Sequence, residues 1–241
     1  MHYYQKVLWL IVISALCTGC GLQMQFSDTG PIGKLQKEKV NKTFSEGLAP
    51  APAVFYDLET IAGSTFEGIN KADWIVAEEG LTKLQSGWQQ AKPYITDPEI
   101  VKKADEALNK LSTAVTEKQN TVSYEELNQF MSSIGSASKS YKLSPLSDII
   151  SVDNSIRDTK FYLEDNNWGK TSAKQKELET AWKQIKPSLE QFGIMGKVTK
   201  THSYINQLKD AVQGENKGSA AAKLDDINTS MAQITAFYRG Q

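Results

Sequence analysis

The fold is decided by residues 74–93, WIVAEEGLTKLQSGWQQAKP, because this stretch recurs 94 residues later as residues 168–187, WGKTSAKQKELETAWKQIKP. Two tryptophans set the register, since they stand fourteen residues apart in both copies. Six of the twenty aligned positions are identical: Trp74 and Trp168, Leu84 and Leu178, Trp88 and Trp182, Gln90 and Gln184, Lys92 and Lys186, and Pro93 and Pro187. A match at one long offset indicates an internal duplication.

The match extends beyond this stretch, at an offset that grows from 94 to 97 residues. A three-residue insertion in the second copy accounts for the change. The pairs at the longer offset are Asn109 with Asn206, Leu111 with Leu208, Ala114 with Ala211, Val115 with Val212, Leu127 with Leu224, and Tyr141 with Tyr238. The sequence therefore predicts two related units, residues 52–143 and 144–241.

Apolar side chains recur in both units at intervals of three and four residues, the spacing of one face of a helix in a bundle. In the stretch quoted above the series is Trp74, Ala77, Leu81, Leu84, Trp88 and Ala91, and in its copy Trp168, Thr171, Gln175, Leu178, Trp182 and Ile185. Segments with the same spacing surround it, at 55–69, 101–115 and 127–141 and again at 149–163, 198–212 and 224–238. No stretch of comparable length alternates as a strand would.

Start and stop signals divide these segments into separate helices. Asp97 precedes Pro98, which places a helix cap before a proline at the first helical position. Ser123 and Glu126 have the spacing of a capping box, and Pro93 and Pro187 are expected to end the second helix of each unit. We therefore predict an all-α fold, a tandem duplication of a four-helix antiparallel bundle-like unit joined by short links.

Composition narrows the classes of function. The chain has 241 residues, of which 40% are hydrophobic and 23% charged, so it can bury a core as globular proteins do. Its 27 basic residues balance 28 acidic ones, and only Arg157 and Arg239 are arginines. Because arginine supplies the usual fork for phosphates and base edges, we expect no nucleic acid partner.

The first twenty residues carry a targeting signal. Residues 7–17, VLWLIVISALC, form an apolar run that is too short to span a bilayer and has the length of a signal-peptide core. Cys17, Thr18, Gly19 and Cys20 follow, and this ending resembles the lipobox of bacterial lipoproteins. The family usually has Leu where Cys17 stands. The resemblance implies cleavage of a signal peptide of residues 1–19 and lipidation of Cys20 with acyl chains such as palmitate, which anchor the chain to the extracytoplasmic side of the cell membrane.

Other interpretations of these residues stay open. A plain secretory signal with incidental cysteines, an uncleaved anchor, or lipidation at Cys17 would each fit part of the pattern. Under the lipobox interpretation Cys17 leaves with the signal and Cys20 carries lipid, so no thiol remains for a disulfide or for catalysis. Residues 20–51, with the stretch Ala49-Pro50-Ala51-Pro52, then form a flexible tether between the anchor and the helical units.

Few residues suggest chemistry. Trp74, Trp88, Trp168 and Trp182 are candidates for the wall of a ligand pocket, although their duplicated positions favour core packing. His202 with Met195 or Met231 would be a haem ligand set, yet a lone histidine on a lysine-rich helix is more often a surface residue. The carboxylate pairs Glu78 and Glu79, Asp105 and Glu106, and Asp225 and Asp226 fit solvated helix faces better than metal sites. We predict no catalytic residue, no metal site and no cofactor.

The helical body is similar in class and in Trp/Leu periodicity to the extracytoplasmic domains of imelysin-like iron-uptake lipoproteins, and equally to four-helix sensor domains. The iron-uptake family has a His-x-x-Glu motif, whereas His202 is followed by Ser203, Tyr204 and Ile205, so its metal role does not transfer. We expect a lipid-anchored binding, scaffold or accessory module with a membrane or envelope protein as partner. The alternative is a carrier of a metal or small molecule for a transport system, and an enzyme ranks third.

Overall fold

The structure, a computed structural model of the chain, describes residues 49–190 and 194–239. These residues belong to one compact unit, Asn41–Gln241, whereas the predicted signal peptide, Cys20 and most of the tether lie outside them. The described part is helical and contains no strand. Its helices are α2 (Ala53–Asn70), α3 (Trp74–Ala91), the short 3-10 helix η1 (Lys92–Tyr94), α4 (Pro98–Thr116), α5 (Asn120–Ser138), α6 (Leu146–Glu164), α7 (Trp168–Glu190), α8 (Met195–Gln213) and α9 (Lys217–Arg239).

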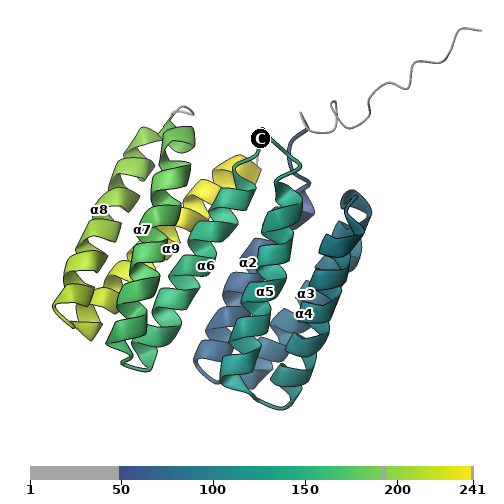
Figure 1. Cartoon of the computed structure of the whole chain (residues 1–241), viewed down its shortest axis with the longest axis horizontal. Helices are drawn as coiled ribbons and strands as arrows, with labels where there is room; N and C mark the ends of the chain where they lie inside the picture. Colours follow the sequence, from purple (N-terminus) through teal and green to yellow (C-terminus); the bar gives the residue numbers. More distant parts are fainter. Residues whose placement is uncertain (1–48, 191–193, 240–241) are drawn as a thin grey trace, which may run out of the picture. The chain divides into compact units, whose positions relative to one another are not determined.

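Successive helices run antiparallel and form two four-helix bundles (Figure 1). In the first bundle α2 pairs with α3 and α4 pairs with α5, and a contact between α2 and α5 closes the ring. In the second, α6 pairs with α7 and α8 with α9, and α6 contacts α9. The predicted all-α fold with a duplicated four-helix unit is therefore confirmed. Among the helices described, none is long and apolar enough to cross a membrane.

The two bundles are joined along their sides into one body. α6 lies against α5 and also contacts α2, while α9 contacts α2 in turn. Buried apolar side chains form a single cluster that runs through both bundles, from Ala51 to Tyr238. Since α2 corresponds to α6 and α5 to α9, the contacts of α5 with α6 and of α9 with α2 are related by the duplication.

The structure also contains a shorter repeat, because all four helix pairs turn in the same way. The links after α2, α4, α6 and α8 each have three residues. The middle residue adopts a positive φ in every case: Ala72 at 54°, Lys118 at 57°, Asn166 at 56° and Glu215 at 50°. The third residue donates its backbone N–H to a carbonyl in the last helical turn, as in Asp73 to Gly68 at 2.8 Å. Each unit is thus itself two copies of one helical hairpin.

Aligned on these turns, the buried positions of the four hairpins coincide. Three residues before the middle residue stand Ile69, Val115, Leu163 and Val212, and sixteen residues after it stand Trp88, Ile134, Trp182 and Met231. All eight side chains are buried. The first two turns of each second helix also share a small or short buried residue, namely Ala77, Ser123, Thr171 and Ala220. Burial is therefore conserved around the hairpin while residue identity is not.

Two predicted boundary signals are wrong. α7 continues through Pro187 to Glu190, because Leu189 is fully buried and keeps the chain helical despite the missing N–H. Ser123 does not cap a helix, since α5 already begins at Asn120 and Ser123 is buried one turn later. By contrast, Asp97 caps α4 as predicted, accepting the backbone N–H of Glu99 at 2.9 Å.

Candidate functional site

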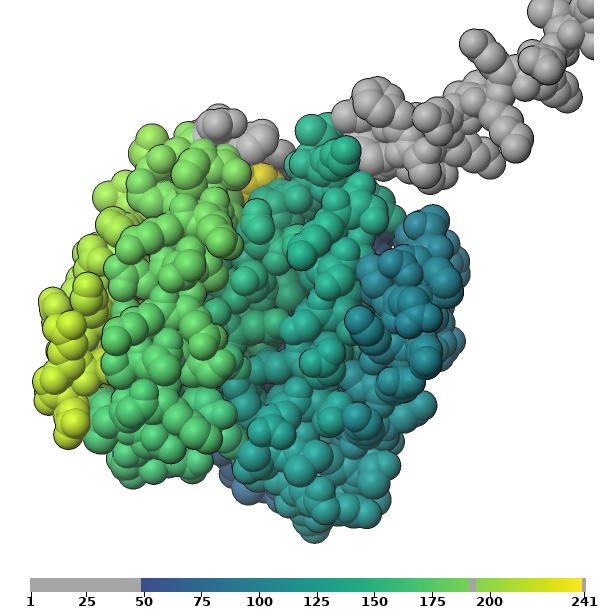
Figure 2. Space-filling view, in the orientation of Figure 1, coloured from purple at the N-terminus to yellow at the C-terminus, as the bar shows by residue number. Residues whose placement is uncertain are grey.

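Two adjoining depressions lie on the face formed by α5, α6 and α7, which stand side by side (Figures 1 and 2). One, of about 360 Å³, lies between α6 and α7, and the other, of about 320 Å³, between α5 and α6. Both are bordered by Ser151 and Gln184, so they form one trough, here called the seam groove. The residues around it are Ser132, Gly135, Ser136, Lys139, Ser147, Asp148, Ile150, Ser151, Asn154, Ser155, Lys176, Glu177, Thr180, Ala181 and Gln184.

Helical spacing explains why the groove is rich in hydroxyl groups. Ser147, Ser151 and Ser155 follow one another at intervals of four on α6, and Ser132 and Ser136 do so on α5, so each series lies on one face of its helix. α5 and α6 approach closely here. A Cβ atom on Gly135 would stand only 3.3 Å from Cγ2 of Ile150. The groove is therefore a shallow polar strip over a tightly packed contact between the two bundles.

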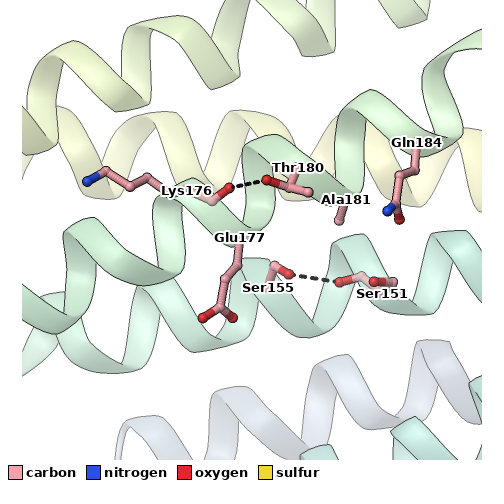
Figure 3. A pocket seen from close by; sticks show the side chains of 7 residues that line it. All are labelled: Ser151, Ser155, Lys176, Glu177, Thr180, Ala181 and Gln184. Atoms are coloured by element: carbon pink, nitrogen blue, oxygen red, sulfur yellow. Dashed lines mark hydrogen bonds between the residues drawn. The ribbon is translucent and has the colours of Figure 1, made fainter.

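The hydrogen bonds of the lining decide what the groove offers to a ligand. The hydroxyls of Ser155 and Thr180 donate to the carbonyls of Ser151 and Lys176, each at 2.9 Å (Figure 3). Ser132 and Ser136 donate in the same way to carbonyls one turn earlier, at 2.8 and 2.9 Å. A hydroxyl whose proton is used still has acceptor lone pairs. The groove thus presents acceptors from its hydroxyls, with donors from its lysines and amides at the rim.

Beneath this face, a buried cluster of charges joins α6 to α2. Nη1 of Arg157 donates to Oε1 of Glu59 at 2.7 Å, and both side chains are about 6% exposed. Asp153, one turn before Arg157, is also buried. Burial, followed by the neighbouring Glu59 carboxylate, holds the pKa of Asp153 well above its ordinary value. Glu59 and Asp153 stand 94 residues apart, so they occupy equivalent positions in the two units.

Further polar contacts fix α5 against α6. Tyr124 and Asn128 of α5 both donate to the carboxylate of Asp158. Nε of Arg157 donates to the side-chain oxygen of Asn128 at 3.4 Å, which connects the contact with the buried cluster. On the α7 side, Nζ of Lys174 lies 3.1 Å from Asp158. These contacts tie α5, α6 and α7 together beneath the groove.

The four tryptophans considered as candidates for a pocket wall, with core packing favoured, are not part of the groove. Trp88 and Trp182 are fully buried in the core, and Nε1 of Trp88 donates to Asp105 at 2.7 Å. Trp74 and Trp168 are half-buried at the starts of α3 and α7, where they pack against the core. None of the four lines either depression. Their surroundings are those of packing residues that pin the helices.

The other candidate residues remain apart from one another. His202 is half-buried on α8, with Nε2 3.5 Å from the side-chain nitrogen of Asn206. Met195 is half exposed at the start of α8, whereas Met231 is buried on α9. Across residues 49–190 and 194–239, no three His, Cys, Asp or Glu side chains are grouped as a metal site would require. Cys20 lies outside the described residues.

Sequence reasoning missed the groove and the buried charge cluster. The serine series at intervals of four was a usable signal for one polar helix face, but nothing marked that two such faces on α5 and α6 are neighbours. Arg157 was noted only as a rare arginine. Its pairing with Glu59, 98 residues earlier, depends on the packing of α6 against α2.

No protein-family model matches the chain, and neither a search of curated proteins nor one of solved structures finds a match. The class of the protein is therefore defined by its own fold, a pair of four-helix bundles built from four similar helical hairpins.

Proposed function

We propose that this protein is a lipid-anchored, extracytoplasmic binding module, attached to the membrane through Cys20 and engaging a polar ligand or partner at the seam groove. One observation carries the binding half of the proposal. The groove lies over the contact between the two bundles, lined by hydroxyls from α5 and α6 and supported by the Arg157 and Glu59 ion pair below. The anchor half rests on the lipobox resemblance of residues 17–20.

The lining favours a ligand rich in hydroxyl or amide groups. Sites for drug-sized apolar ligands are mostly enclosed and apolar, with a few polar groups for orientation. The seam groove is open to solvent and lined mainly by polar residues, so it suits an extended chain that lies across the surface, such as a glycan or a peptide segment of an envelope protein. Lys139 and Lys176 at its edges would donate to carbonyl or hydroxyl oxygens of that chain.

The test fills the groove without touching the core. Ser151 is exposed and borders both depressions, so Ser151→Phe places a large ring in the trough. Ser203, exposed on α8 away from the groove, gives the matched control Ser203→Phe. The full-length protein is isolated from membranes with its bound components after crosslinking in cells.

We expect a component retained by the wild type and by Ser203→Phe to fall at least about tenfold with Ser151→Phe, because that ring removes the contact surface. Equal recovery with all three proteins contradicts a binding role for the groove. If the lost component is a metal or a small molecule rather than a macromolecule, the carrier function is the correct one. The size of the depressions, about 360 and 320 Å³, would admit such a ligand.

A further inference from the structure

The end of the body at which the chain enters α2 brings together several separate links. Because the helices alternate in direction, residues 49–52, the links after α3 and α5, the start of α8 and the end of α9 all lie at this end, which is uppermost in Figure 1. We call it the entry end. The three-residue turns after α2, α4, α6 and α8 form the opposite, far end.

Exposed apolar side chains occur at each of three sites on the entry end. Tyr94, in η1 between α3 and α4, is 55% exposed, and Leu143, between α5 and α6, is 64% exposed. Met195, the first residue of α8, is 50% exposed. All three are large and carry apolar surface that folding leaves in contact with water. Apolar side chains exposed on one face of a protein are the groups that can enter the boundary between lipid headgroups and acyl chains.

Lysines surround two of these side chains. Lys139 and Lys142 precede Leu143, and Lys197 and Lys200 follow Met195 within two turns. Within the described part of the chain, none of these four lysines forms an ion pair. Such cations are available to the phosphates of an anionic bilayer, to which each basic residue near the surface adds affinity. Acidic side chains are present as well, at Asp97, Glu99 and Asp148, and at Glu190, which pairs with Lys186.

The far end also exposes apolar side chains, and there acidic residues outnumber the lysines. Ile75 is 73% exposed, and Val76 and Val122 are about 40% exposed, in the first turns of α3 and α5. The charged residues near them are the acidic Asp73, Glu78, Glu79, Glu117 and Glu125 and the basic Lys71 and Lys118, so the balance is negative. An anionic lipid surface repels these acidic surroundings. Exposed apolar area alone therefore does not determine which end meets a membrane. The sign of the charge next to the apolar side chains determines it.

We propose that the entry end is a docking surface for an anionic lipid bilayer, in which Tyr94, Leu143 and Met195 enter the headgroup layer and the neighbouring lysines contact lipid phosphates. This inference rests on the proposed function, since it takes the anchor at Cys20 as given. Only 28 residues separate Cys20 from Ala49, so the anchor keeps the body near the bilayer without choosing the face that meets it. The entry end supplies that choice.

The test measures which end touches lipid, with the full-length protein in vesicles of phosphatidylcholine and phosphatidylglycerol. Cys17 and Cys20 are the only cysteines of the chain, and under the proposed function neither retains a reactive thiol. Leu143→Cys therefore gives a single labelling site at the entry end, and Asp165→Cys a matched site in an exposed far-end turn. A fluorophore on each thiol reports contact with brominated lipid chains through quenching.

We expect the fluorophore at position 143 to be quenched and that at position 165 to stay unquenched. Adding Lys142→Glu and Lys197→Glu, neither of which lines the seam groove, should shift the equilibrium away from the docked state about 30-fold or more and so relieve the quenching. The far-end changes Lys118→Glu and Lys170→Glu should not. Equal quenching at both positions, or none at 143, overturns the inference.

Failure of the anchor itself gives a different result. If Cys20 carries no lipid, the protein without any introduced cysteine reacts with the fluorophore and fails to co-sediment with vesicles after a high-salt wash. A docking failure leaves the unmutated protein unlabelled and vesicle-bound. The two outcomes are therefore separable in the same preparation.

Discussion

Arg157 shows how much of the body depends on one side chain. It is buried, pairs with Glu59 of α2, and reaches Asn128 of α5 and Asn154 of its own helix. Arg157 thereby connects α6 with α2 and α5, two helices of the first bundle that α6 contacts. Buried ion pairs add little net stability relative to apolar residues of the same size, but breaking one leaves an uncompensated charge.

We therefore expect Arg157→Met to lower the free energy of unfolding by about 3–5 kcal/mol, because Glu59 remains buried without its partner. Urea titration followed by circular dichroism measures the change. The double variant Glu59→Gln with Arg157→Met should recover a substantial part of the loss. A double variant as unstable as the single one would show that the ion pair is not the cause.

Asp153 predicts a dependence of stability on pH. Its pKa in the folded state is raised above the ordinary 3.8 by burial and by Glu59, so the native structure favours the protonated carboxyl. The stability that it contributes is full below pH 3.8 and is lost as the pH rises through the folded-state pKa. Asp153→Asn replaces the carboxyl with a neutral group that does not ionise.

The advantage of Asp153→Asn over the wild type in the free energy of unfolding should therefore be small near pH 4 and grow toward pH 8. Denaturant titrations at several pH values measure it, with the exposed Asp148→Asn as control. An advantage that is constant across this range contradicts the assignment of a raised pKa to Asp153.

At the scale of the elements, the helices could be predicted from the sequence because their apolar spacing is regular and long. The series from Trp74 to Ala91 coincides with α3, and the segments at 55–69 and 149–163 lie within α2 and α6. The ends were harder to predict. Pro187 was expected to end α7, but a fully buried Leu189 beyond it outweighs the local signal, which no reading of local residues alone would reveal.

The hairpin repeat escaped prediction for a different reason. Its four copies share positions of burial and a backbone turn, whereas the residues at those positions differ. Trp88, Ile134, Trp182 and Met231 occupy one equivalent place, and only the two tryptophans match. Identity therefore showed the longer repeat of two units, and backbone geometry was needed to show the shorter one. The groove was missed for the same reason, since it depends on which helices are neighbours.

The shared turn predicts a stabilising substitution. Lys118 has a φ of 57°, in the left-handed region where a Cβ atom costs about 1 kcal/mol and glycine does not. Lys118→Gly should raise the free energy of unfolding by about 0.5–1 kcal/mol. Asn166→Gly, at the equivalent place, should gain less because asparagine tolerates this conformation. Equal or negative changes at both positions would contradict the assigned turn geometry.

The contact between α2 and α3 predicts a substitution that destabilises the fold. A Cβ atom on Gly80 would lie 2.2 Å from Oγ1 of Thr65, a side chain that is fully buried, whereas one on Gly63 would meet nothing within 4 Å. Gly80→Ala should therefore lower the melting temperature, with a loss of about 1–3 kcal/mol. Gly63→Ala should leave it unchanged or raise it, because alanine favours the helix. The opposite order would argue against this packing of the two helices.

At the scale of the whole molecule, the two bundles form one body whose faces differ in character. The seam groove offers hydrogen-bond acceptors along α5 and α6, and the entry end combines lysines with exposed apolar side chains. The proposed membrane attachment would give both features a role, since an anchored body could rest one end on lipid and present its side to a partner. The sequence predicted the anchor from residues 17–20, which lie outside the described part of the chain, and could not predict either surface.

The intact mass of the protein purified from the membrane fraction tests the central claim most directly. We predict a chain that begins at Cys20, lacks residues 1–19, and carries the added mass of a diacylglyceryl group with or without a further acyl chain. Cys20→Ala should abolish both the cleavage and the added mass. A membrane form that begins at another residue, or one in which Cys20 is unmodified, would contradict the account.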